Sequence, residues 1–190
     1  LLIRLLAARL NSDILGDWVR YESEGYPKDV DVPQYRIVGV SYRGIFLGPL
    51  GSGIYNAQIP PHLIEKHADK RWTNYEVRES IAAISKMLKK SKTDGGTLCI
   101  DASKLIPLLQ GKMYKGYGCN DVVGTISPSA FYQIQQTVRS KILELTIELE
   151  KSVPGANYIA FETTVTNKSE TEQVQQISQQ IIYGPVSTVV

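Results

Sequence analysis

Two histidines lie close together in this sequence and raise the question of a metal site. His62 and His67 are five residues apart and have Glu65 and Asp69 beside them. Metal-binding helices place their histidines three or four residues apart. Each residue turns a helix by roughly 100°, so a spacing of five puts the two rings on different faces. The sequence therefore predicts surface histidines and no metal site.

Cys99 and Cys119 are the other residues with conspicuous chemistry. They form no CxxC pair, and no neighbouring residue activates either thiol. We expect buried, reduced thiols and the cytoplasm as the default compartment, with a disulfide between the two as the alternative. The chain contains no GxSxG, SxxK or HExxH motif. We predict no catalytic residue and no cofactor.

Glycines are dense between Gly48 and Gly53, as they are in loops that bind phosphate groups. The stretch lacks the GxxxxGK[ST] spacing, and it lacks a GxGxxG pattern opening a helix. We interpret it as a structural turn, because glycine supplies backbone conformations that other residues avoid.

Charged residues form three groups whose chemistry needs weighing. A dispersed polar site could be assembled from Asp29, Arg36, Arg43 and Arg78. Carboxylates gather around Tyr26, and lysines follow one another near the end of a predicted helix. We expect both of these groups to be solvated charge. The carboxylates are Asp17, Glu22, Glu24, Asp29 and Asp31. The lysines are Lys86, Lys89, Lys90 and Lys92.

Composition limits the class of protein. The 190 residues are 43% hydrophobic and 21% charged, which is enough apolar surface to fold and argues against general disorder. A chain of this length fits one domain, with or without an appendage. The net charge of +2 gives no support to nucleic-acid binding. No apolar run approaches the roughly 20 residues that span a bilayer, and arginines interrupt residues 1–10, which favours a helix over a signal sequence.

Helices are predicted from apolar spacing and from the residues that end them. Residues 14–24 carry one apolar face and stop at Gly25-Tyr26-Pro27. Residues 73–90 repeat apolar residues at three- and four-residue steps, and residues 102–109 form a short helix. The clearest element is a helix from Pro128 to Lys151, because Ser127 is a favoured N-cap and proline suits the first helical position. Its wide stripe, which includes Leu143 and Ile147, favours burial inside the domain over a dimer seam.

Strands are predicted where β-branched and aromatic residues concentrate. Residues 35–42 and 45–47 suggest a hairpin around Arg43-Gly44, and residues 98–100 and 158–166 suggest further strands. Residues 114–124 are rich in glycine and tyrosine and are expected to be a loop. Periodicity leaves residues 174–183 undecided between helix and strand.

These elements predict an α+β fold, mainly helical. We expect a helical bundle around one long amphipathic helix, with a small β-hairpin and a C-terminal strand-like extension. The predicted division is a helical domain over residues 1–155 and a polar, β-prone extension over residues 156–190. Trp18 is expected to anchor the core, packed with the helix containing Ile81 against the long helix.

Several motifs occur in order along the chain. They are Asp17-Trp18, Glu24-Gly25-Tyr26-Pro27, Val32-Pro33-Gln34-Tyr35-Arg36, Gly48 to Gly53, Asn56 to Pro61, Val77 to Ile81, Ile147 to Glu150 and Ile182-Tyr183-Gly184. In this order they resemble the AbiTii domain of bacterial abortive-infection and phage-defence proteins. The resemblance covers most of the chain and implies a role in conflict between bacteria and phage. It implies no catalytic mechanism, because the matching residues are mainly glycines, prolines, aromatics and helix-face positions. Asp17 stands where the family pattern has Glu, and the charge is kept.

Three functions stay open at this point. The leading hypothesis is an interaction or self-association module, a homo-oligomer or a partner of another protein. Its expected contact is the apolar C-terminal segment: Ile177, Ile181, Tyr183, Val186 and Val189. The alternatives are a toxin-like enzyme, such as a nuclease using the dispersed polar site, and a nucleic-acid binder using Lys86 to Lys92.

Overall fold

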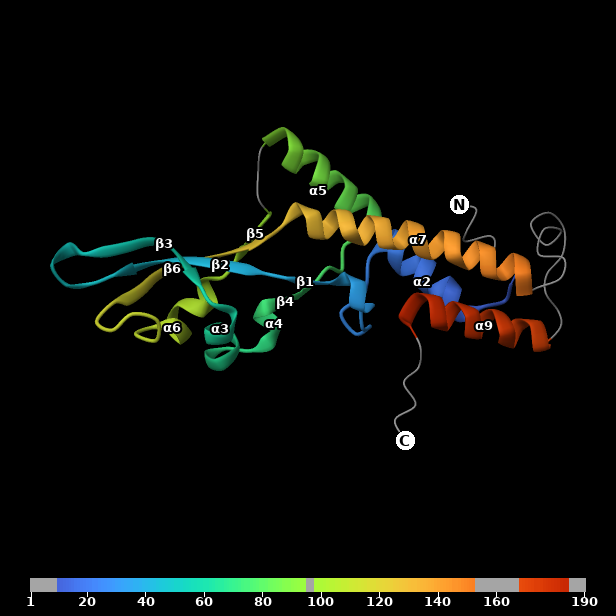
Figure 1. The fold of residues 1–190 in the computed structure, drawn as a ribbon, viewed down its shortest axis with the longest axis horizontal. Helices are drawn as coiled ribbons and strands as arrows, with labels where there is room; N and C mark the ends of the chain where they lie inside the picture. The colour runs from blue at the N-terminus through green and yellow to red at the C-terminus, as the bar shows by residue number, and fades with distance from the viewer. Residues whose placement is uncertain (1–9, 95–97, 153–167, 185–190) are drawn as a thin grey trace. The chain divides into compact units, whose positions relative to one another are not determined.

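A computed structural model describes residues 10–94, 98–152 and 168–184 (Figure 1). Contacts within the chain divide it into two compact units. Unit 1 comprises residues 1–36, 78–85 and 133–190, and unit 2 comprises residues 37–77 and 86–132. The fold is α+β, as predicted. The prediction of a single helical bundle around one long helix is wrong, because the strands of unit 2 bury apolar side chains of their own.

Helix α2 (Asp13–Glu24) begins and ends where the local sequence predicts. The Ser12 hydroxyl accepts a hydrogen bond from the Leu15 amide at 3.3 Å and caps the first turn. Gly25 ends the helix with φ +103°, a conformation that favours glycine. The buried face of α2 carries Leu15, Trp18, Val19 and Glu22, so three apolar side chains share this face with one carboxylate.

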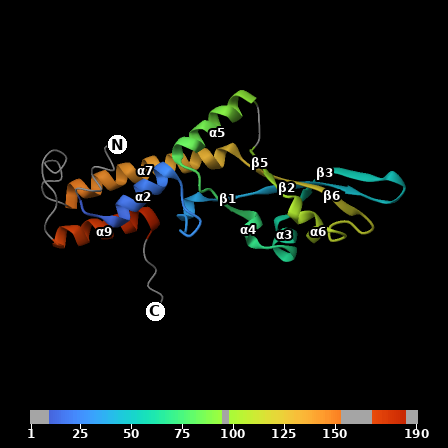
Figure 2. The same ribbon diagram turned by 180° about the vertical axis from the view of Figure 1, so that it is seen from behind.

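Unit 1 packs α2 with α9 (Lys168–Tyr183) and α7 (Pro128–Ser152), which lie side by side in both views (Figures 1 and 2). Trp18 is buried in the shared core, as predicted. Helix α7 follows the predicted range closely. The core comprises Leu10, Leu15, Trp18, Val19, Val138, Leu145, Leu149, Val174, Ile181 and Ile182.

Residues 168–183 are helical, so the predicted strand-like extension is wrong for this part of the chain. The buried residues explain the helix. The buried residues are Val174, Ser178, Ile181 and Ile182. Counted from Val174, the other three follow at four, seven and eight residues, and these positions share one face of a helix. The predicted helix at residues 1–9 and strand at residues 158–166 lie outside the described residues. So does the predicted boundary at residue 155, and it stays a prediction.

Unit 2 contains two antiparallel sheets. Strands β1 (Ile37–Gly39) and β4 (Asn74–Glu76) form a two-stranded sheet. The larger sheet has the order β3-β2-β6-β5, from β2 (Ser41–Leu47), β3 (Gly53–Ile59), β5 (Leu98–Asp101) and β6 (Gly118–Ile126). Its buried face carries Tyr42, Phe46, Ala57, Ile59, Cys119, Val122 and Ile126.

Three short helices follow strands of this sheet in the chain, and each of them buries an apolar side chain. They are α3 (Pro61–His67), η3 (Ser103–Leu105) and α6 (Ile106–Leu109), and η3 and α6 contact β6. Their buried residues are Ile64, Leu105 and Leu109. The short helix predicted at residues 102–109 is therefore present as two pieces. Helix α4 (Lys70–Thr73) leads into β4, and η2 (Pro49–Gly51) lies in the turn between β2 and β3.

The predicted hairpin and loop of this region are wrong in their boundaries. Strand β2 continues through Arg43-Gly44, with a shift of pairing register between Gly44 and Phe46, and the hairpin turn lies at residues 48–52. A Cβ atom on Gly44 would lie 2.7 Å from the Asp121 carbonyl oxygen, so this glycine permits close strand pairing. Residues 118–126, which fall largely in the predicted loop, form β6. A Cβ on Gly124 would lie 2.8 Å from the Tyr42 ring.

Helix α5 (Ile81–Asp94) begins eight residues later than predicted. Residues 74–76 instead pair with β1 as strand β4. The Ser80 hydroxyl accepts a hydrogen bond from the Ala83 amide at 3.2 Å and supplies the N-terminal cap. The apolar periodicity of residues 73–90 starts before this cap, so the predicted helix began too early.

Candidate functional site

The predicted dispersed polar site is divided between the two units. Arg36 and Arg78 belong to unit 1, and Arg43 lies exposed on β2 in unit 2, where it donates to the Asn56 carbonyl at 3.3 Å. Arg78 donates to the Pro27 and Val30 carbonyls, the second at 2.8 Å. It thereby holds the loop that carries the exposed Asp29.

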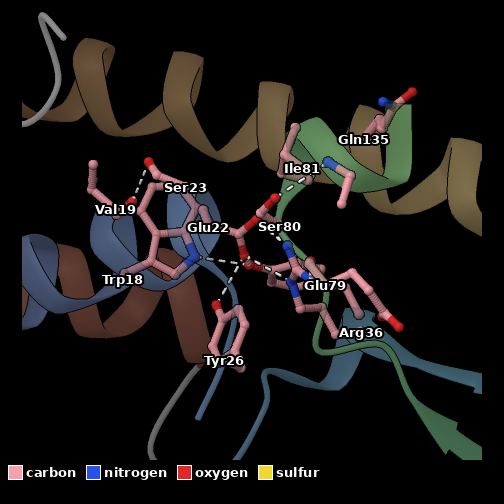
Figure 3. A network of polar contacts seen from close by, with 12 residues as sticks. Trp18, Val19, Glu22, Ser23, Tyr26, Arg36, Glu79, Ser80, Ile81 and Gln135 are labelled. Carbon is pink, nitrogen blue, oxygen red and sulfur yellow. Dashed lines mark hydrogen bonds and ion pairs between the residues drawn. The ribbon is translucent and has the colours of Figure 1, made fainter. Parts of the chain in front are cut away.

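Among the described residues of unit 1, Arg36 makes the closest ionic contact. It is 0% exposed, and its Nη2 lies 2.5 Å from Oε2 of Glu22. The Nε atom donates to Oε1 of the same carboxylate at 3.0 Å, so the contact is bidentate (Figure 3). The third nitrogen, Nη1, donates to the Glu79 carbonyl at 2.7 Å. One guanidinium thus joins α2 to the segment preceding α5.

Two tyrosines complete the surroundings of the Glu22 carboxylate. Tyr35 and Tyr26 donate from their hydroxyls to Oε1 at 2.7 and 2.9 Å. The Trp18 indole donates to the Tyr35 hydroxyl at 2.8 Å. The Arg36 guanidinium carbon lies 4.8 Å from the centroid of the Tyr26 ring. We call Trp18, Glu22, Tyr26, Tyr35 and Arg36 the Glu22 network.

The electrostatics of the Glu22 network follow from its burial. Burial, and then the charge of Glu22, raise the pKa of both Tyr26 and Tyr35 far above the usual tyrosine range. Burial opposes the charge on Arg36, yet hydrogen bonding to Glu22 holds its pKa above the ordinary arginine value. At neutral pH the tyrosines are therefore neutral donors and Arg36 is a cation.

The bonding in the Glu22 network explains what the arrangement does. The carboxylate accepts four hydrogen bonds, and three nitrogens of Arg36 donate to protein oxygens. These contacts join α2, the turn η1 (Gln34–Arg36) and residue 79, which are distant in the sequence. The chemistry is that of a fixed structural ion pair, since removing either partner would strand a buried charge.

The expectation of solvated charge around Tyr26 is wrong for Glu22. Asp17, Glu24, Asp29 and Asp31 are exposed, but Glu22 is buried. The signal for this was present in the sequence. Glu22 falls seven residues, or about two turns, along the apolar face begun by Leu15 and Trp18, and a carboxylate on such a face requires a buried partner.

The other residues considered for chemistry lie apart. His62 is exposed and His67 half-buried, and no group of three metal-ligating side chains occurs in the described part of the chain. Both cysteines are free thiols. Cys119 is buried, and burial followed by the charge of Asp121 raises its pKa, whereas Cys99 is exposed, against the prediction. Lys86, Lys89 and Lys90 are exposed on α5.

The predicted C-terminal contact residues differ in accessibility. Ile181 is buried in the core of unit 1, Ile177 packs half-buried against it, and Tyr183 is exposed. Val186 and Val189 lie outside the described residues. A groove beside Ile14 is lined on α9 by Glu172 and by the amides of Gln175, Gln176, Gln179 and Gln180.

Two apolar side chains of α7 are exposed where burial was expected. Leu143 is 62% exposed and Ile147 is 41% exposed. They lie four residues apart and so share one face of the helix. Nothing in the sequence distinguishes them from Ile142 and Leu145, which pack inward.

Comparison with protein families assigns the chain. The model of the AbiTii family matches residues 1–176, which include most of both units. The chain belongs to the AbiTii family. Membership makes it a protein of the bacterial abortive-infection class, which acts in phage defence. Searches of curated proteins and of solved structures gave no match. In the described ranges, none of the AbiTii chain's helices combines the length and apolar character needed to span a bilayer.

Proposed function

We propose that this AbiTii chain serves phage defence as a self-association module, with the exposed face of α7 as its contact. The observation that supports this is the pair Leu143 and Ile147, two large apolar side chains that share a face and contact solvent. Their exposure costs hydrophobic free energy that a partner surface would recover, at about 25 cal/mol per Å² of buried apolar area.

The spacing on this face of α7 suits a helix–helix contact. Gln136, Ser140, Leu143, Ile147 and Glu150 are all exposed and follow one another at steps of four, three, four and three residues. That is the heptad spacing of a coiled-coil seam, with its two apolar residues at the centre. The remaining positions of this seam are polar, which predicts weak association.

A second copy is the partner that the spacing favours. In an antiparallel pairing of two α7 helices centred between Leu143 and Ile147, each Leu143 meets Ile147 of the other copy. The same pairing places Ser140 level with Glu150 of the other copy, and Arg139 level with Lys151, whose ammonium group lies 2.7 Å from the Glu148 carboxylate of its own helix. The contact is then self-complementary, as a two-fold dimer requires.

Sedimentation velocity over a range of concentrations tests the proposal. We expect the parent to associate as concentration rises and Leu143→Asp to remain monomeric, because the variant places a charge at the centre of the seam. Val123→Asp is the matched control, since it makes the same change at an exposed apolar residue of unit 2. Equal association of the parent and Leu143→Asp would refute the contact on α7.

The predicted C-terminal contact needs a truncation that keeps α9. A chain ending at Gly155 would lose Val174, Ile181 and Ile182 from the core, so its behaviour would report unfolding. A chain ending at Gly184 keeps these residues and removes Val186 and Val189. Loss of association on this truncation, with α7 unchanged, would assign the contact to the C-terminal segment.

A further inference from the structure

The turn between β2 and β3 exposes a group of large apolar side chains. Leu50 is fully exposed, Tyr55 is 66% exposed and Leu47 is 40% exposed. Leu47 pairs with Gly53 across the hairpin, and a Cβ on Gly53 would lie 2.8 Å from the Tyr55 ring. The Tyr55 ring therefore lies over Gly53 beside Leu47. We call Leu47, Leu50 and Tyr55 the hairpin tip.

Leu50 is held outward by an unfavourable backbone. Its φ of +56° and ψ of +29° lie in the left-handed region, which bulky side chains rarely adopt. The turn is fixed on both sides, because the Gly48 amide donates to the Ser52 carbonyl at 2.8 Å and the Ser52 amide to the Pro49 carbonyl at 3.1 Å. A rigid turn thus presents an apolar side chain to solvent.

A second loop of unit 2 supplies positive charge beside the hairpin tip. Residues 110–117 lie at the same end of the sheet as the turn (Figures 1 and 2). A Cβ on Gly48 would lie 2.7 Å from the Tyr117 ring, so the two loops touch. Lys112 and Lys115 in this second loop are exposed.

Positive charge predominates in this part of unit 2. Residues 41–60 and 102–120 contain no aspartate or glutamate, and their basic residues are Arg43, Lys104, Lys112 and Lys115. The exposed Asp121, which follows in β6 opposite Ile45, is an acidic neighbour of these ranges. A second copy of this surface would therefore meet like charge. The hairpin tip is also only three side chains wide, whereas a stable protein interface buries roughly 800 Å² on each partner.

We propose that the hairpin tip binds the surface of an anionic lipid bilayer. Leu50 and Leu47 enter the boundary between headgroups and acyl chains, which recovers the free energy of their exposure. Tyr55 has an apolar ring and a polar hydroxyl, and such side chains favour the headgroup level. Lys112 and Lys115 attract the anionic headgroups. The contact is peripheral, with unit 2 lying on the membrane.

Sedimentation with lipid vesicles tests this surface. We expect the full chain to bind vesicles of phosphatidylcholine containing phosphatidylserine much more tightly than vesicles of phosphatidylcholine alone. Raised salt should weaken this binding, because counterions screen the lysines. Lys112→Gln and Lys115→Gln should each lower the partition coefficient about fivefold.

Leu50→Asn separates lipid binding from folding. Asparagine tolerates the left-handed region better than leucine, so this variant should be at least as stable as the parent. It should nevertheless bind the anionic vesicles about tenfold more weakly, because the apolar side chain is lost. Val123→Asn introduces the same residue at an exposed position of β6 that pairs with Arg43 and Asp101, away from the turn, and this matched control should bind as the parent does.

Three results would overturn the proposal. The first is a parent that binds neither kind of vesicle, and the second is equal vesicle binding by the parent and Leu50→Asn. The third is a Leu50→Asn variant that binds vesicles as the parent does but has lost association with other copies of the chain or with an acidic protein. That result would assign the hairpin tip to a protein partner. Leu143→Asp tests self-association separately, so the two proposals fail independently.

Discussion

Replacing Glu22 by glutamine tests the account of the Glu22 network. Glu22→Gln keeps the size of the side chain and removes the charge that Arg36 faces at 2.5 Å. Arg36 is 0% exposed, so its cation would remain buried without a counter-ion. The amide nitrogen of glutamine also replaces one acceptor with a donor. Because every neighbour of the carboxylate is itself a donor, this new donor faces other donors.

The expected loss of stability is large. Breaking a buried ion pair by removing one partner costs about 3–5 kcal/mol. For a chain of this size each kcal/mol lowers the melting temperature by about 2–4 °C, so the change should lie between about 6 and 20 °C. The loss should concern unit 1, which contains the whole network.

Tryptophan fluorescence can assign the loss to a unit. Trp18 belongs to the Glu22 network, and Trp72 belongs to unit 2. In a Trp72→Phe background, urea unfolding followed by fluorescence therefore reports on unit 1 alone. The urea midpoint should fall strongly for Glu22→Gln in this background.

A double variant supplies the control. Glu22→Gln combined with Arg36→Met removes both charges, so the double variant should be more stable than Glu22→Gln alone. A Glu22→Gln variant within about 1 kcal/mol of the parent would refute the reasoning, because that is the range of a solvent-exposed ion pair. So would a double variant whose loss equals the sum of the single losses.

Three further predictions concern the same structure. Unit 1 should lose stability as the pH rises above about 10, because the pKa values of Tyr26 and Tyr35 are raised in the folded chain and the unfolded chain releases these protons first. At about pH 11 each tyrosine contributes about 1.4 kcal/mol to the loss. In Tyr35→Phe, the free energy of unfolding should therefore differ less between pH 8 and pH 11 than in the parent. Ser12→Ala should lower the free energy of unfolding by about 1 kcal/mol in urea, since it removes the cap of α2. A thiol reagent should label the exposed Cys99 in the folded chain and reach the buried Cys119 only on unfolding, which mass spectrometry would show as one added label and then two.

Elements that are specified by neighbouring residues were predicted well. The ends of α2 follow from a serine before the first turn and a glycine after the last. The start of α7 follows from Ser127 and Pro128, with the Ser127 hydroxyl accepting from the Ser129 amide at 3.3 Å. These signals act within a few residues, so one sequence contains all the information they need.

Elements that depend on distant residues were predicted poorly. The glycines of residues 114–124 suggested a loop, but Gly124 makes room for Tyr42 of the neighbouring strand. Gly44 likewise permits the approach of the Asp121 carbonyl. A single sequence does not show which strand will lie opposite a glycine, and the same composition is typical of loops and of closely paired strands.

The Glu22 network lies between these two cases. The position of Glu22 on the apolar face of α2 predicts a buried cationic partner, but many lysines and arginines in the sequence could be that partner. Arg36 is chosen because η1 brings it beside α2, while Arg78 is occupied by the Pro27 and Val30 carbonyls. The exposed sides of Leu143 and Ile147 were missed for the same reason, since burial depends on which helices pack against α7.

The Glu22 network also constrains how α2 can pack. If α2 rotated by one residue, roughly 100°, Glu22 would leave Arg36 and a buried guanidinium would face apolar side chains. That cost penalises other packings of α2 more than it stabilises the native one. Replacing both Glu22 and Arg36 by apolar residues should therefore give a chain more stable than Glu22→Gln alone, although the Tyr26 and Tyr35 hydroxyls lose their acceptor, and Trp18 should lose its unique environment. Broadened Trp18 indole resonances in that variant would support this role, and a single sharp Trp18 resonance would show that apolar packing alone sets the position of α2.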